Sequence, residues 1–99
     1  MIEDREFMIH LLDFYGSLLT QTQAEVMRLY YEDDLSLTEI AENRNVSRNA
    51  VHDMIKTSEA GLKDYEVKLA LYQKWQRRKA LITEIQETKN YEKINELEE

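Results

Sequence analysis

The chain has 99 residues, a formal net charge of −7 at pH 7, no proline and no cysteine. This length suffices for one domain with a modest core, so we expect a helix-turn-helix helical domain over residues 1–72 and a C-terminal helical extension over residues 73–99. The lack of cysteine excludes disulfides and thiolate metal sites, and no apolar run approaches the roughly 20 residues of a membrane span, so we expect a cytoplasmic protein.

The composition favours helices over strands. Only two glycines interrupt a chain rich in Leu, Ile, Glu and Lys, and nothing punctuates it strongly enough for a sheet. We therefore expect an all-α fold.

The negative charge is concentrated at the N-terminal end of the chain. Residues 1–35 carry −6, whereas residues 36–75 are neutral overall. Because a polyanion is repelled by a net negative protein, this balance disfavours indiscriminate binding of nucleic acid and makes the middle of the chain its least repulsive part.

The first element is a core helix over residues 3–19. Its apolar residues recur at the i, i+3, i+4 spacing of a helix buried along a wide stripe. His10 and Asp13 have the spacing of a metal-binding pair, but no third ligand is evident, so we expect no metal.

A second helix begins at Thr20, which forms a predicted capping box with Gln23, and ends near Glu32. Asp33 and Asp34 follow as a short acidic loop. Adjacent carboxylates in a linker are usually solvated, so we assign them no catalytic role.

Residues 36–56 predict a helix-turn-helix. Ser36 with Glu39 forms a second capping box, Ser47 opens the next helix, and Asn45 occupies the tight turn because asparagine tolerates the left-handed conformation. Ala41 is small enough for two helices to cross closely. The apolar face of the crossing is expected to comprise Ile40, Val46, Val51, Met54 and Ile55.

The helix that begins at Ser47 is expected to continue far beyond Lys56, because one apolar stripe extends along it. The stripe comprises Ala50, Val51, Met54, Ile55, Ser58, Leu62, Tyr65, Leu69 and Tyr72. The opposite face begins with Arg48, Asn49, His52, Asp53 and Lys56, which would point at a DNA groove.

A break is expected within residues 73–79, because Leu81, Ile82 and Ile85 fall out of phase with the stripe. The segment 80–99 is polar with thinly spaced apolar residues, so we expect that it either needs a partner surface or stays mobile. The basic cluster at the break could bind an acidic partner or RNA phosphates, or be a solvated helix end. It comprises Trp75, Arg77, Arg78 and Lys79.

Three phrases are specific in combination: DFYGSLLT, LYYEDDLSLTEIAE and VSRNAVHDMIK. Over residues 7–71 the chain resembles the YlxM-like family of small bacterial helix-turn-helix proteins, itself similar to region 4 of RNA polymerase sigma factors. The resemblance implies an all-helical, sigma-region-4-like fold and a regulatory role in the signal recognition particle pathway.

Two functions remain open. One is a DNA-binding regulator, with contacts from Arg44, Ser47, Arg48, Asn49, His52 and Lys56. The other is an adaptor that engages the signal recognition particle GTPase or its RNA and keeps the helix-turn-helix as a scaffold. The sequence has no phosphate-binding loop and no nucleophile beside a base, so we expect no enzyme and no cofactor. The long apolar stripe suggests a homodimer, unless the tail folds back over it.

Overall fold

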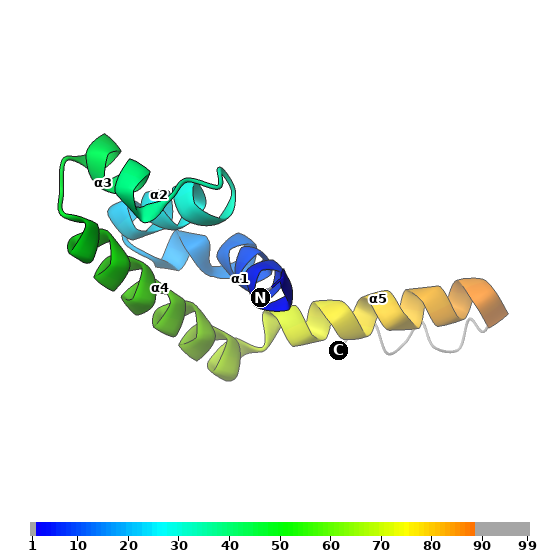
Figure 1. The fold of residues 1–99 in the computed structure, drawn as a ribbon. Coiled ribbons are helices and arrows are strands. Elements are labelled where there is room, and N and C mark those ends of the chain that lie inside the picture. The colour runs from blue at the N-terminus through cyan, green and yellow to red at the C-terminus, as the bar shows by residue number, and fades with distance from the viewer. Residues whose placement is uncertain (1, 89–99) are drawn as a thin grey trace. The chain divides into compact units, whose positions relative to one another are not determined.

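The fold of the chain is all-α, as the sequence predicts. A computed structural model describes the backbone of residues 2–88 and the side chains of residues 5–86, and this part of the chain contains no strand. Its elements in order are α1 (Ile2–Tyr15), the 3-10 helix η1 (Gly16–Leu18), α2 (Gln21–Tyr31), α3 (Leu37–Arg44), α4 (Arg48–Leu69) and α5 (Leu71–Thr88) (Figure 1).

Helix α1 ends earlier than predicted and gives way to η1. The change occurs at Gly16, which is buried where α2 passes close by. A Cβ atom on Gly16 would lie 3.0 Å from the guanidinium of Arg28 on α2, so the missing side chain makes room for this contact. The η1 turn then redirects the chain from α1 into α2.

The predicted start of α2 is confirmed. The backbone N–H of Gln23 donates to Thr20 Oγ1 at 3.2 Å, and the N–H of Thr20 donates to Gln23 Oε1 at 3.1 Å. Helix α2 ends at Tyr31, and the acidic residues Asp33 and Asp34 lie in the loop before α3, as expected. Asp34 adopts a left-handed conformation with φ 58°.

The core lies where α4 packs against α1, α2 and α3, with α4 running along the other three helices (Figure 1). Leu11 and Leu12 of α1 and Leu62 of α4 are fully buried, and each such side chain stabilises the fold by about 1.5–3 kcal/mol. The other core side chains are Met8, Tyr15, Val26, Met27, Tyr31, Ile40, Ala41, Val51 and Ile55.

Val46, predicted for the apolar face of the crossing, and Ala50, predicted for the apolar stripe along α4, both lie outside the core. Val46 is 45% exposed and Ala50 is also exposed. Only the backbone of Val46 takes part in the turn, with its N–H donating to the carbonyl of Ala41 at 3.0 Å. Val46 directly follows the left-handed Asn45, so it belongs to the turn between the two helices rather than to their packed faces.

Helix α4 extends far beyond Lys56, as predicted. The prediction of a break within residues 73–79 is wrong. Helix α4 ends at Leu69, Ala70 takes a left-handed conformation with φ 53°, and α5 continues unbroken from Leu71 to Thr88. The stripe predicted to reach Tyr72 is therefore interrupted at Ala70.

The chain divides into two compact units, Met1–Leu69 and Ala70–Glu99, and each is described by itself. The predictions made above for the segment 80–99 fall partly outside the described residues, because residues 89–99 are not among them. Within the described part, no helix is long and apolar enough to cross a membrane.

Candidate nucleic-acid interface

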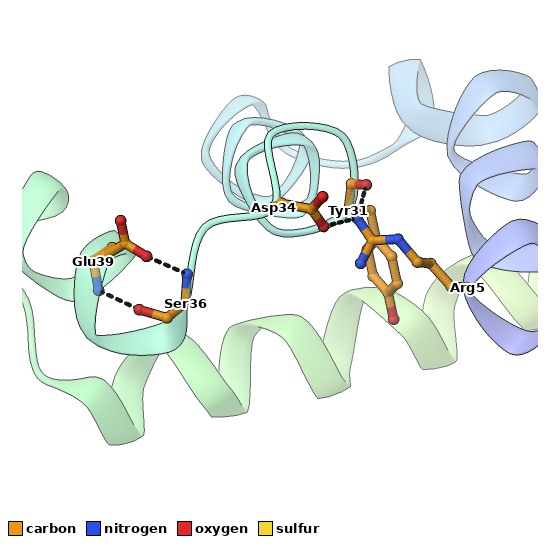
Figure 2. Close-up of polar contacts among 5 residues, drawn as sticks. All are labelled: Arg5, Tyr31, Asp34, Ser36 and Glu39. Carbon is orange, nitrogen blue, oxygen red and sulfur yellow. Dashed lines mark hydrogen bonds and ion pairs between the residues drawn. The ribbon is translucent and has the colours of Figure 1, made fainter. Parts of the chain in front are cut away.

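The predicted helix-turn-helix is formed by α3, a tight turn and the first half of α4. Figure 2 shows the capping box that opens α3, in which Glu39 N–H donates to Ser36 Oγ at 3.1 Å and Ser36 N–H donates to Glu39 Oε1 at 3.0 Å. Asn45 ends α3 with φ 56° and ψ 47°. Ser47 Oγ accepts from the N–H of Ala50 at 3.0 Å and so caps α4. Both helix starts and the turn between them are confirmed.

The first turns of α4 present a polar surface, defined here as the α4 face: Arg48, Asn49, His52, Asp53 and Lys56. All five side chains are exposed. Positions 48, 52 and 56 follow one another at the i, i+4 spacing, and 49 and 53 do the same beside them, so the five share one side of the helix. Among residues 5–86, no ion pair or hydrogen bond is formed by the Arg48 guanidinium.

Lys56 and His52 of the α4 face, and Arg44 before it, already have carboxylate neighbours. Lys56 Nζ lies 3.6 Å from Glu59 Oε1, and His52 Nδ1 lies 3.5 Å from Asp53 Oδ1. Arg44 Nη1 donates to Glu25 Oε2 at 2.7 Å, which connects α3 to α2. The Arg44 hydrogen bond, helped by one from Gln21, lowers the pKa of the Glu25 carboxyl.

A second set of polar contacts lies behind the α4 face. The Tyr31 hydroxyl on α2 donates to Glu59 Oε2 on α4, and Glu59 in turn neighbours Lys56. Burial, followed by the hydrogen bond to Glu59, raises the pKa of Tyr31 well above its usual value. The hydrogen bond from Tyr31 of α2 therefore holds Glu59 in its position beside Lys56.

Arg5 of α1 completes this arrangement. Its guanidinium donates to the backbone carbonyl of Tyr31 at 2.6 Å and pairs with Asp34 (Figure 2). The same guanidinium lies 5.9 Å from the centroid of the Tyr31 ring. Contacts thus run from α1 through α2 to the cationic surface of α4. The sequence alone does not reveal these contacts, because the residues are 26 to 29 positions apart and no local pattern links them.

The predicted basic cluster lies on α5, in the second unit. Lys79 Nζ is 4.3 Å from the centroid of the Trp75 ring, a cation–π distance, and the Tyr72 ring lies 5.9 Å from the Trp75 ring. Arg77, Arg78 and Lys79 are exposed, whereas Trp75 is half-buried.

His10 and Asp13 lie on α1. Within the described residues no group of three or more His, Cys, Asp or Glu side chains is placed to hold a metal ion.

Comparison with known proteins gives a family match over residues 2–99, to UPF0122, described as "Putative helix-turn-helix protein, YlxM / p13 like". A UPF0122 protein of Bacillus mycoides strain KBAB4 is 52% identical over 97 residues, which cover 97% of this chain and 88% of the relative. Two UPF0122 proteins of Bacillus cereus, from strains AH187 and G9842, are each 54% identical over 87 residues, which cover 88% of this chain and 79% of each relative.

Proposed function

The chain belongs to the UPF0122 family of helix-turn-helix proteins, and we propose that it is a non-catalytic regulatory protein that binds DNA through the α4 face. The observation that carries this proposal is the exposure of five polar side chains on the first turns of a capped helix that follows a tight turn. In a helix-turn-helix this helix lies in the major groove, with its N-terminal residues against the base edges.

The side chains of the α4 face suit this task. Arg48 can bond the O6 and N7 atoms of guanine and Asn49 the N6 and N7 atoms of adenine, each in a bidentate manner. His52 and Lys56 lie one and two turns further along, where they would contact bases or phosphates. Ser47 contributes by fixing the start of α4, and Arg44 would contact the DNA backbone.

Selection of duplexes from a random DNA pool tests the proposal. We expect the wild-type protein to enrich a shared motif, and the Asn49→Ala variant to lose the preference for adenine at one position of it. Lys63→Ala, an exposed change further along α4, should leave the motif unaltered. Failure to enrich any motif over the pool would contradict sequence-specific binding.

The second candidate function is the adaptor role in the signal recognition particle pathway. What favours it is the set of carboxylates beside the cations, since Glu25 holds Arg44 and Glu59 neighbours Lys56, which weakens attraction to phosphate. A complex driven by phosphate contacts weakens steeply with salt, whereas an apolar protein interface does not. Salt dependence therefore separates the two functions.

A homodimer and a cytoplasmic location are part of the same proposal. A dimer would present two α4 faces symmetrically, as a palindromic DNA site requires. The support for a dimer is narrower than the sequence suggests, because Leu62 is buried and the Tyr65 ring lies 5.9 Å from that of Tyr15 on α1. Of the large side chains at the C-terminal end of the predicted stripe on α4, Leu69 stays exposed, at 45%. DNA binding would place the protein in the bacterial cytoplasm, where the DNA is.

A further inference from the structure

We propose that helix α5 docks an acidic amphipathic helix of a partner protein. The docking surface, called here the α5 stripe, comprises Leu71, Trp75, Arg78, Ile82 and Ile85. This proposal stands apart from DNA binding, because the α5 stripe belongs to the second unit of the chain and shares no residue with the α4 face.

The spacing of the α5 stripe is that of a helix–helix seam. Its residues follow one another at intervals of four, three, four and three, which keeps them on one side of α5 and matches the a and d positions of a heptad repeat. The break expected within residues 73–79 would have divided this seam. Because α5 is continuous from Leu71 to Thr88, the seam extends over more than three turns.

Leu71 and Ile82 of the α5 stripe are exposed, and Trp75 and Ile85 are half-buried. Ile82 is 44% exposed and Leu71 39%, and no residue from 71 to 86 is buried. An isolated helix of this length is marginally stable in water, so α5 gains stability from any surface that covers the seam. Aliphatic side chains at regular helical spacing are best covered by the side chains of another helix.

Arg78 determines the charge of the partner. It lies in the middle of the seam, is exposed, and has no carboxylate partner among residues 5–86. Residues 71–82 contain four basic side chains and no acidic one. A guanidinium covered by a helical partner needs a carboxylate opposite, since an unpaired buried charge is strongly destabilising. The partner helix therefore carries an acid at this position and acids along its flanks.

The charges and apolar side chains of the α5 stripe also disfavour two other occupants, a second copy of the chain and a nucleic acid. A second copy of α5, paired along the α5 stripe in either direction, would bring the basic residues of 71–82 against one another. A nucleic-acid backbone would satisfy Arg78 but leave Ile82 and Leu71 in contact with water. An apolar helix with acidic flanks satisfies both parts of the stripe.

Trp75 provides the means of testing this, because it is the only tryptophan in the chain and lies in the α5 stripe. The probe is a synthetic peptide of about three heptads with Leu and Ile at the a and d positions, Glu at e and g, and one Glu at the central d position. We expect this peptide to shift the Trp75 emission of the full-length protein to shorter wavelength in a saturable manner. A second peptide, with every Glu replaced by Lys, is expected to give no shift.

Charge reversal then tests whether Arg78 is the residue that selects an acidic partner. Arg78→Glu is expected to weaken binding of the acidic peptide at least tenfold and to permit binding of the lysine peptide. Arg77→Glu, the same change one residue away and off the seam, should alter the affinity less than threefold. Arg48→Ala combined with Lys56→Ala should leave peptide binding unchanged, which separates this test from the DNA proposal.

Three results would overturn the proposal. The first is equal binding of both peptides. The second is a Trp75 emission that does not respond to the acidic peptide but is quenched by RNA, with the quenching abolished by Arg78→Glu. The third is a wild-type dimer in sedimentation that Arg78→Glu converts to a monomer. The second result would assign the stripe to nucleic acid, and the third to a second copy of the chain.

Discussion

The hydroxyl of Tyr31 on α2 donates a hydrogen bond to the carboxylate of Glu59 on α4. Tyr31 is buried, with 7% of its surface exposed. This bond joins two helices that meet 28 residues apart in the sequence, directly behind the α4 face. Glu59 presents its other oxygen to Lys56, so a contact that stabilises the core also sets the charge environment of the candidate site.

The Tyr31 contact predicts a loss of stability at alkaline pH. The pKa of Tyr31 is raised in the folded protein, so the stabilisation is fully present below the usual tyrosine pKa of about 10 and declines as pH rises above it, where the unfolded chain ionises first. Urea unfolding at pH 8 and above pH 10 measures the decline. Tyr31→Phe should cost about 1–3 kcal/mol at pH 8 and flatten the decline.

Core substitutions test the helix crossing. Val51 is 1% exposed, so Val51→Asp buries an unpaired charge and should unfold the domain. Ala41→Leu overfills the crossing and should cost about 1–3 kcal/mol or more. The matched control is Val46→Asp, because Val46 is 45% exposed and should tolerate the charge. Thermal unfolding followed by circular dichroism distinguishes these variants. An unfolded Val46→Asp variant beside a folded Val51→Asp variant would contradict the placement of Val51 in the core and of Val46 in the exposed turn.

The Glu25–Arg44 ion pair predicts an acid-side effect. The pKa of Glu25 is lowered in the folded protein, so its stabilisation is present above the usual glutamate pKa of about 4.3 and is lost as pH falls through the lowered value. Glu25→Gln should flatten the dependence of stability on pH below about 5. Chemical denaturation from pH 3 to pH 6 measures it, and a slope identical to wild type would show that the pair makes no contribution.

The local features of this fold could be predicted because each is determined within a few residues. The Thr20 and Ser36 capping boxes need only a partner three positions on, and Asn45 is one of the few residues that tolerate a left-handed turn. The all-α class, the long α4 and its exposed polar face follow from helical periodicity, which is equally local.

The missed features depend on tertiary packing or on backbone states that the residue type does not favour. Alanine has no preference for the left-handed conformation of Ala70, which costs roughly 1–2 kcal/mol, so nothing in the sequence located the end of α4 there. The Arg5–Asp34 ion pair and the 2.6 Å hydrogen bond from Tyr15 to Glu66 join residues 29 and 51 positions apart. Such pairs become evident only when the helices are placed in three dimensions.

Self-association is tested through Leu69, the last residue of α4 and an exposed member of the predicted apolar stripe. If the homodimer forms, sedimentation equilibrium at micromolar concentration should give twice the chain mass of 11.9 kDa, and Leu69→Glu should reduce it to that of a single chain. A single-chain mass for both proteins would exclude the dimer.

The salt dependence of DNA affinity tests the central proposal most directly. Fluorescence anisotropy with the duplex selected by the wild-type protein gives the slope of log K against log salt concentration, which changes by about 0.9 for each phosphate contact. Arg48→Ala combined with Lys56→Ala should severely weaken binding, and the loss of the Lys56 phosphate contact should reduce the slope by about 1, with thermal unfolding unchanged. The control, Lys63→Ala combined with Lys68→Ala, removes the same charge from exposed positions later in α4 and should retain nearly the full affinity and slope. Equal losses in the two double variants, or wild-type affinity in the first, would contradict recognition of DNA by the α4 face.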